Sequence, residues 1–130
     1  MNRPTVRSTP GIHAEHTLAL DRCAPSTARE SVRATCATAF PHLVDDAMLL
    51  VSEIVTNAVT HGRGPVRLQV DCDHSGIHVA VDDANPALPR ARRIDRRRHS
   101  GRGLVLLQNL ATDWGVRRTK NGKQVWFRLA

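Results

Sequence analysis

Aromatic residues are scarce in this 130-residue chain, which has no tyrosine, two phenylalanines and two tryptophans. A domain of this length can bury a sizeable core, so the core must be built from Leu, Val, Ile and Ala. Aromatic rings are also the surfaces on which unpaired bases stack. Their scarcity therefore argues against a protein that binds single-stranded nucleic acid.

Long apolar segments are missing as well. No apolar run approaches the roughly 20 residues that a membrane-spanning helix needs. The N-terminal segment, MNRPTVRSTPGIHA, lacks the apolar stretch of a signal peptide. We therefore expect a cytoplasmic protein that does not enter a membrane.

Cysteine contributes three residues, Cys23, Cys36 and Cys72, and none has a CxxC or His–Cys metal-binding spacing. An odd number of cysteines does not describe a disulfide framework either. We expect reduced thiols and no zinc site, with Cys36 buried on the inner side of a helix.

Positive charge dominates, with a formal net charge of +7. Much of the excess lies in one arginine block, which consists of Arg90, Arg92, Arg93, Arg96, Arg97 and Arg98. Such a block can meet phosphate groups or an acidic partner, and solvated surface is the plainer interpretation for most of its members. A basic nucleic-acid-binding module is an alternative, although no nucleic-acid-binding motif accompanies the charge.

The segment 48–62, MLLVSEIVTNAVTHG, has the clearest pattern in the chain. At about 100° per residue, apolar side chains fill one half of a helix and short polar side chains fill the other. Glu53 and Asn57 are four residues apart and so lie on one face. A single acid among short polar groups favours a ligand-binding face, whereas an ordinary amphipathic helix in water is the alternative. Gly62 is expected to end the helix.

The residues before this helix are predicted to form a tail, a strand and a first helix. Residues 1–13 are polar and are expected to be a disordered tail, and residues 15–20 are expected to form a strand. A helix then starts in the segment 25–27, where Thr27 has capping-box spacing to Glu30.

Two β-hairpins are predicted after it. In residues 66–83, apolar side chains occupy every second position before and after the turn sequence DHSG. Asp83 falls on the same inward-facing side of its strand as the apolar residues before it. A carboxylate at the end of a buried strand face favours a functional role, although a plain turn residue explains the local pattern equally well. The second hairpin lies near the C-terminus, where Asn121-Gly122 supplies the turn.

Between the hairpins lie a loop rich in proline and arginine, residues 84–100, and a helix that follows Gly101 and Gly103. A loop of this length in a compact domain is usually functional or disordered. A glycine-rich turn at a helix N-terminus presents free N–H groups and a positive dipole end, which suits phosphate. The order of elements predicts one domain in which helices cover one face of a sheet.

Three motifs, in this order, carry a resemblance to a known family. They are EIVTNAVTHG at residues 53–62, VAVDDANP at residues 79–86 and GRGL at residues 101–104. With the tail segments WGV and GKQVWF, they resemble the GHKL ATP-binding domain of gyrase-type and histidine-kinase-type ATPases. Within that superfamily the chain is most similar to the stand-alone anti-sigma-factor serine/threonine kinases of bacteria.

The resemblance implies an α+β fold, a two-layer α/β sandwich of the Bergerat type. Its mixed, mostly antiparallel sheet of about five strands would be covered on one face by three helices. Residues 14–130 would form this histidine kinase-like ATPase domain. ATP and Mg²⁺ are the ligands that the resemblance implies.

The resemblance also assigns roles to single residues. Glu53 would be the catalytic general base, and Asn57 would bind Mg²⁺ through its amide oxygen. Asp83 would accept a hydrogen bond from the adenine amino group. The other implied nucleotide contacts are His61, Asn85, Gly101, Arg102, Gly103, Leu104 and Gln124.

Two departures from the family pattern bear on activity. The family's second motif reads Asp-x-Gly-x-Gly, but here the segment is Asp83-Ala84-Asn85-Pro86-Ala87. A threonine found near the phosphates in many relatives is replaced by Gln124. The base pocket and the hinge of the following loop are therefore expected to differ from those of the relatives.

Two functions follow from the resemblance. The first is an ATP-binding serine/threonine kinase that phosphorylates a serine of an anti-anti-sigma (STAS-type) partner and sequesters a sigma factor, with a homodimer as a further implied assembly. The second is a non-catalytic ATP-binding regulator that acts by sequestering a partner. Direct nucleic-acid binding is not expected.

Overall fold

The structure is a computed structural model that describes residues 11–87 and 102–130. Within these ranges the elements follow one another in the order β1-α1-α2-β2-β3-α3-β4-β5. The helices are α1 (Ala24–Cys36), α2 (Val44–His61) and α3 (Arg102–Leu110). The strands are β1 (Ile12–Leu18), β2 (Val66–Asp73), β3 (Gly76–Asp83), β4 (Asp113–Arg118) and β5 (Lys123–Leu129).

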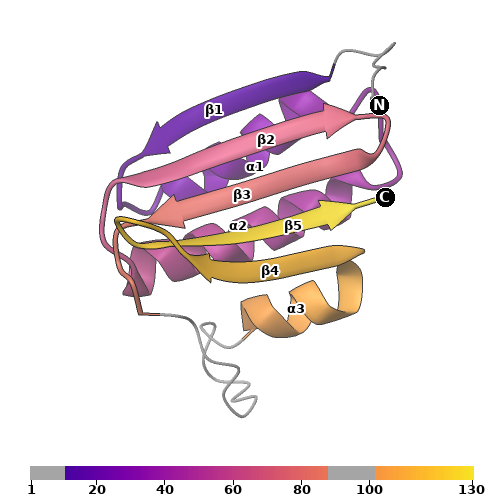
Figure 1. Cartoon of the computed structure of the whole chain (residues 1–130). Helices are drawn as coiled ribbons and strands as arrows, with labels where there is room; N and C mark the ends of the chain where they lie inside the picture. Colours follow the sequence, from indigo (N-terminus) through magenta and orange to yellow (C-terminus); the bar gives the residue numbers. More distant parts are fainter. Residues whose placement is uncertain (1–10, 88–101) are drawn as a thin grey trace, which may run out of the picture.

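The strands form one sheet with the spatial order β1-β2-β3-β5-β4 (Figure 1). Every pairing between the described strands is antiparallel, so the expectation of a mixed sheet is corrected. The reason is that both hairpins are closed by tight turns, and β5 then pairs back onto β3. Figure 1 shows α1 and α2 behind the sheet and α3 beside β4. The predicted two-layer α+β fold is confirmed.

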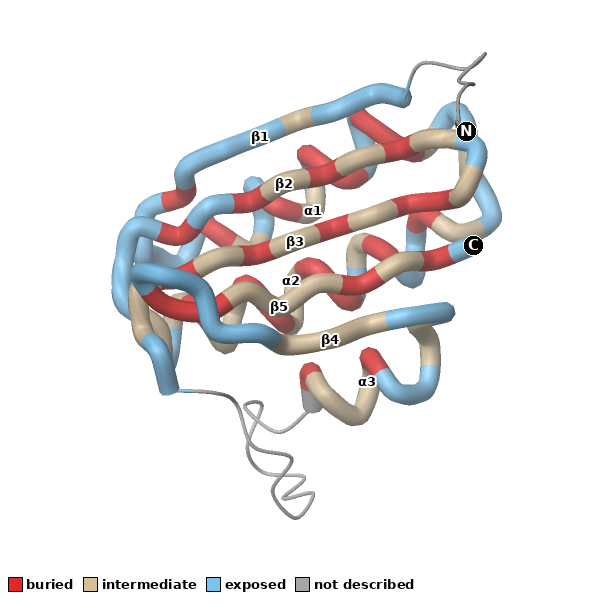
Figure 2. The backbone as a smooth tube through the Cα atoms, viewed as in Figure 1, coloured by how far each residue is buried: buried red, intermediate tan, exposed pale blue. Residues whose placement is uncertain are grey.

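Buried side chains alternate with more exposed ones along the strands, and the buried side chains form the face of the sheet that packs against the helices. Val66, Leu68 and Val70 of β2 are fully buried, and Figure 2 shows the same red-and-tan alternation along β3. The opposing stripe of α2 consists of Val44, Ala47, Leu50, Val51, Ile54, Val55 and Ala58. The core is aliphatic, as the composition predicts, with Phe127 as its largest fully buried side chain.

The start of α1 differs from the prediction. Its N-cap is Cys23, which makes no side-chain capping bond, and Pro25 lies in the first turn. Proline suits that position because its missing N–H would have no helical partner. Thr27 therefore lies inside the helix, and Glu30 pairs with Arg33 on the next turn. The predicted capping box is wrong.

The first strand begins earlier than predicted. Ile12 and His13, which were expected in the tail, pair with Cys72 and Asp71 of β2. The apolar alternation that identifies strands is weak here, because most of β1 is exposed on both faces (Figure 2). Residues 1–10 of the expected tail lie outside the described residues.

Cys36 lies in the core on α1, as predicted, with Cys72 of β2 also buried. Burial raises the pKa of the Cys36 thiol to about 12 and raises that of Cys72 as well. Both thiols are therefore protonated at neutral pH and are poor nucleophiles. Among the described helices, none has both the length and the apolar character that crossing a bilayer requires.

Exposed ion pairs supplement the backbone pairing between β1 and β2. His13 Nδ1 lies 2.6 Å from Asp71 Oδ1, and Arg67 Nη2 donates to Glu15 Oε1 at 2.7 Å. The hydrogen bonds that the His13 ring donates to the carboxylates of Asp71 and Glu15 raise the pKa of His13. Protonation of one imidazole is thereby coupled to the attachment of the edge strand.

We expect this coupling to make the contribution of His13 to stability depend on pH. Because its pKa is raised in the folded state, the stabilisation is complete below the unfolded value of about 6.5. It is lost as the pH rises through the higher folded value. His13→Gln should therefore lower the free energy of urea unfolding at pH 5.5 and change it little at pH 9. A substitution effect that is the same at both pH values would contradict the coupling.

Candidate functional site

The N-terminus of α3 is seated on the polar face of α2. An ideal Cβ built on Gly103 would lie 2.8 Å from Asn57 Nδ2 and 3.9 Å from Glu53 Cβ. A separation of 2.8 Å is closer than a carbon atom can approach that nitrogen, so a Cβ at position 103 would displace the Asn57 carboxamide from its place. The structure thus brings together Glu53, Asn57 and Gly103, which the sequence analysis singled out on two separate segments.

The direction in which Glu53 and Asn57 point is set by the buried side of α2. Ile54, Val55 and Ala58 are packed in the core, so the helix cannot rotate about its axis. Glu53 and Asn57 are half-buried on the other side, one helical turn apart. A carboxylate and a carboxamide are therefore held side by side under the start of α3.

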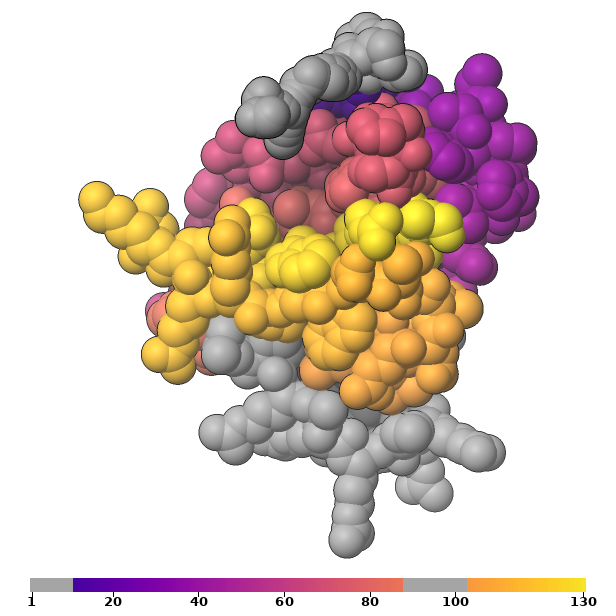
Figure 3. All heavy atoms as spheres, turned by 45° about the vertical axis from the view of Figure 1, so that its right-hand side comes forward, coloured from indigo at the N-terminus to yellow at the C-terminus, as the bar shows by residue number. Residues whose placement is uncertain are grey.

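Helix α3 faces this pair with its positive end. The first N–H groups of a helix have no helical acceptor, and the helix dipole favours negative charge there. Leu107 is fully buried, and Leu104 is half-buried against the core, which anchors α3 in this position. In Figure 3, α3 and the β4–β5 hairpin lie together along one side of the molecule. Gly101 lies outside the described residues, and α3 begins at Arg102.

Asp83 projects inward at the end of β3, as its parity predicts, and its side chain is only 3% exposed. Lys123 Nζ donates to Asp83 Oδ1 at 3.1 Å and lies 3.0 Å from Oδ2. The backbone N–H of Asn85 donates to Asp83 Oδ1 at 2.8 Å. These donors hold the carboxylate in a fixed, buried position.

The residues after Asp83 are attached to the end of α2. Asn85 Nδ2 donates to the carbonyl of His61 at 2.7 Å, and the Ala84 N–H donates to the carbonyl of Arg63 at 2.8 Å. Hydrogen bonds to the carbonyls of His61 and Arg63 thus hold the segment after Asp83. In this segment Asn85 and Ala87 replace the two glycines of the family pattern. The imidazole of His61 itself is exposed, so its carbonyl makes this contact.

Two glycines allow close packing around Asp83. A Cβ on Gly62 would lie 2.4 Å from the Ala58 carbonyl oxygen and 3.0 Å from Asp83 Cγ. A Cβ on Gly122 would lie 1.9 Å from the Asp83 carbonyl oxygen. Gly62 has extended rather than left-handed backbone, with φ of −84°. It ends α2 as predicted, but its smallness is needed for the approach of β3.

Residues 19–129 match a family model described as the histidine kinase-like ATPase domain. The chain belongs to this family. A search of curated proteins finds no match to the chain. Domains of this family bind ATP, which agrees with a helix N-terminus that faces a carboxylate and a carboxamide across a glycine contact.

The site of this ATPase domain fits a nucleotide with a hard divalent cation. Asn57 and Glu53 offer oxygen ligands of the kind that Mg²⁺ prefers, and Asn57 is the residue expected to hold the ion. Gly103, which has no side chain, lets the start of α3 lie against Asn57. Asp83 offers carboxylate oxygens, which are hydrogen-bond acceptors, at the end of β3.

One residue expected at the site is not brought to it. Gln124 pairs with Asp82 in the β3–β5 register and therefore points to the opposite face of the sheet from Asp83. There its Oε1 accepts a hydrogen bond from Arg117 Nε at 3.1 Å. The arginine block lies within residues 88–101, outside the described residues.

Lys123 was missed by the sequence analysis, although a signal was present. It has the inward parity of Val125 and Phe127, and it lies directly opposite Asp83 in the register. A lysine that faces a core opposite a buried acid indicates an ion pair. Only the pairing of β5 with β3, which the sequence does not specify, makes that inference possible.

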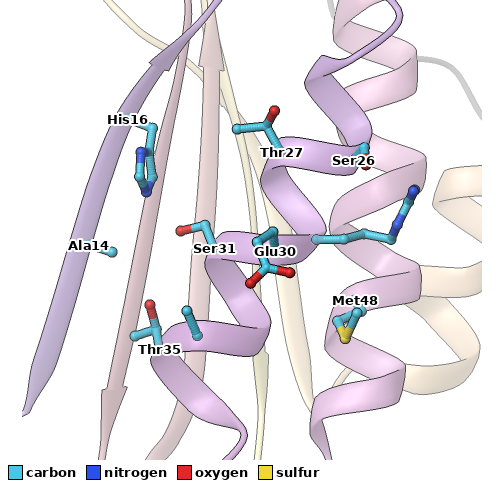
Figure 4. Close-up of a pocket in the computed structure, with 10 residues that line it drawn as sticks. Ala14, His16, Ser26, Thr27, Glu30, Ser31, Thr35 and Met48 are labelled. Carbon is cyan, nitrogen blue, oxygen red and sulfur yellow. The ribbon is translucent and has the colours of Figure 1, made fainter.

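The structure also has a hollow that these residues do not line. It is formed around α1, next to β1, and measures about 650 Å³. Figure 4 shows Thr27, Ser31 and Thr35 on the side of α1 that faces β1, with His16 opposite them. None of Glu53, Asn57, Asp83 and Gly103 lines it, so it is not the nucleotide site.

Gly103→Ala tests the contact between α3 and α2. In a helix, alanine is preferred over glycine by about 1 kcal/mol, so propensity alone predicts a more stable protein. The added Cβ instead meets Asn57, and overpacking costs about 1–3 kcal/mol. We expect the affinity for ATP, measured by calorimetry, to fall about tenfold or more.

Gln108→Ala, on the exposed side of α3, is the matched control and should bind ATP as the unmodified protein does. If Gly103→Ala raised the melting temperature and left the affinity for ATP unchanged, the close approach of α3 to Asn57 would be refuted.

Proposed function

We propose that this chain is an ATP-dependent serine/threonine protein kinase of the anti-sigma-factor type. It would transfer the γ-phosphoryl group of ATP to a serine of an anti-anti-sigma (STAS-type) partner, and it would sequester a sigma factor. The observation that carries the proposal is the seating of Gly103 on Glu53 and Asn57. This contact supports the proposal because the carboxylate, the carboxamide and the first N–H groups of α3 would then act on one phosphate group.

Phosphoryl transfer needs mainly positioning and neutralisation of charge, and the site is suited to both. The N–H groups at the start of α3 would hold the phosphate oxygens. Glu53 would accept the proton of the attacking serine hydroxyl. As the bond between that oxygen and the γ-phosphorus forms, the bond to the β–γ bridging oxygen breaks, and ADP leaves.

Asn57 would hold Mg²⁺ against the phosphates. An ion held there would neutralise negative charge on the phosphates. Asn57 lies one turn after Glu53 on the same face of α2, so the base and the ion would approach the same phosphate group. Asp83, at the end of β3, would receive the adenine amino group.

A non-catalytic regulator is the second candidate, and one observation favours it. The segment after Asp83 lacks the family's glycines and is held by hydrogen bonds to the end of α2. Such a segment is less suited to act as a hinge for the loop that follows. In this case ATP would be a structural ligand, and the protein would act by sequestering its partner.

Substitution of Glu53 separates the two candidates. Glu53→Gln keeps the size and half-burial of the side chain but removes the base. For the kinase we expect transfer from labelled ATP to a STAS-type protein to fall about 10²–10⁴-fold, with unchanged affinity for ATP. Asn57→Ala should instead abolish the gain in affinity for ATP that Mg²⁺ produces.

Binding of ATP to the unmodified protein, with no transfer to any serine of a STAS-type protein, would favour the regulator. Failure to bind ATP at millimolar concentration, with or without Mg²⁺, would refute both candidates. Thr60→Ala, on the exposed end of α2, serves as the control for general effects on the helix.

A further inference from the structure

The face of the sheet that points away from the helices takes no part in the nucleotide site. Figure 1 shows α1 and α2 behind the sheet, and no helix among the described residues covers its other side. We call that side the open face. Its residues alternate along each strand with the buried residues of the core, so the strand register gives the position of each one.

A central row of uncharged residues crosses four strands of the open face. Trp126 of β5 lies opposite Ala80 of β3 and opposite Gly115 of β4. Gln69 of β2 extends the row, since it lies opposite Ala80. A Cβ on Gly115 would lie 2.7 Å from Trp126 Nε1, so the indole ring rests against the backbone of β4. A partly exposed tryptophan among small neighbours is the kind of residue that anchors protein–protein interfaces.

Charges flank the central row in a regular pattern. On β2, β3 and β4 an acid lies two positions to one side of the row, and a basic residue lies two positions to the other side. These residues are Arg67 and Asp71 on β2, His78 and Asp82 on β3, and Asp113 and Arg117 on β4. On β5 the same positions hold Gln124 and Arg128. Each of the three strands thus presents one basic end and one acidic end, separated by an uncharged centre.

This pattern is complementary to itself. Two open faces can pack about a twofold axis that runs along the central row, across the strands. Each strand then meets the same strand of the second copy in the reverse direction, so its basic end meets an acidic end. On β4, Arg117 meets Asp113 of the second copy, and the two Trp126 rings meet at the axis.

Pairing within one copy leaves part of this surface ready for further contacts. Arg128 Nη2 donates to Asp113 Oδ2 at 2.7 Å. Arg117 donates to Gln124 through Nε, and the terminal nitrogens of its guanidinium are further donors. Asp82 Oδ1 is shielded from water and accepts no hydrogen bond from any residue that the structure describes. An acceptor in this state is costly, so the acid of β3 favours an added donor from outside the chain.

Solvation alone is an incomplete explanation of the open face. Alternating charges would keep an exposed sheet in water, but they would do so without a tryptophan at their centre. An interface explains both features, because interface centres are rich in aromatic residues and interface rims are polar. Sheets packed face to face lie about 10 Å apart, which lets side chains of the two copies meet.

We propose that the open face is a self-association surface, on which a second copy of this chain packs face to face with Trp126 at the centre and opposite charges paired around it. A second copy is the occupant that self-complementary charges select, since an unrelated partner would need no such symmetry. The inference goes beyond the proposed function and is independent of it, because Glu53, Asn57 and Gly103 belong to α2 and α3.

Mixing two charge variants tests this surface. Arg117→Asp gives β4 an acid on both sides of the central row, and Asp113→Arg gives it a base on both sides. Each variant alone brings like charges together across the twofold axis, which disfavours association. In sedimentation equilibrium the unmodified chain should approach twice its mass of 14.3 kDa as its concentration is raised, and each variant alone should remain near 14.3 kDa. An equimolar mixture should regain the dimer, because the acidic strand of one variant meets the basic strand of the other.

Trp126→Ala tests the centre of the surface. We expect the dissociation constant of the dimer to rise at least about tenfold, as for a residue that anchors an interface. Lys120→Asp makes the same change of charge as Arg117→Asp, in the exposed turn of the same hairpin, and this control should dimerise as the unmodified chain does. Circular dichroism establishes that each variant is folded.

The inference is refuted if the unmodified chain stays monomeric up to about 1 mM. It is also refuted if the dimer survives Arg117→Asp and Trp126→Ala, or if the two charge variants are folded and fail to associate when mixed. Should Asp113→Arg not fold, the other two variants decide. Binding of ATP is measured separately, so failure of the proposed nucleotide site would leave this surface standing.

Discussion

The contact between Gly103 and Asn57 is the constraint on which the site depends. It joins two residues that are 46 positions apart along the chain, and it is this close because glycine has no Cβ. α3 is held there by Leu107 in the core, and α2 is held by its buried stripe. The polar groups themselves contribute little to that placement. Apolar packing on the far side of each helix positions the polar groups that face the ligand.

A second group of contacts surrounds Asp83. The end of α2, the end of β3 and the start of β5 meet around the buried pair of Asp83 and Lys123. Such a pair costs desolvation energy, and breaking it by removing one partner typically costs about 3–5 kcal/mol. An apolar pair of the same volume would hold the strands equally well. The retention of two charges therefore suits a part of the molecule that recognises a polar ligand.

Much of the fold was predictable because its signals are local. The period of α2, the alternation of β2 and β3, and the Asn121-Gly122 turn all lie within short windows of sequence. Predictions failed where the signal was weak or ambiguous. β1 is exposed on both faces and therefore lacks the alternation of apolar and polar residues that identifies a strand. The residues that resemble a capping box lie inside α1, because the helix begins earlier, with a proline in its first turn.

The same distinction between local and long-range signals applies to the residues of the candidate site. Helical spacing predicted that Glu53 and Asn57 share a face, and strand parity predicted that Asp83 points inward, because both patterns are local in the sequence. Strand parity also separates Lys123 from Gln124, because adjacent residues on a strand point to opposite faces. Only the register of β5 on β3 shows that Lys123 meets Asp83.

By itself, the sequence determined which residues share a face of a helix or strand, since the helical and strand periods depend on the backbone alone. Tertiary structure decided which faces meet: α3 on α2 at Gly103, and β5 on β3 with Lys123 against Asp83. The physical reason is that such contacts depend on how well whole surfaces pack. The quality of this packing depends on residues far apart in the chain, so no single segment of the sequence contains a pattern that reveals it.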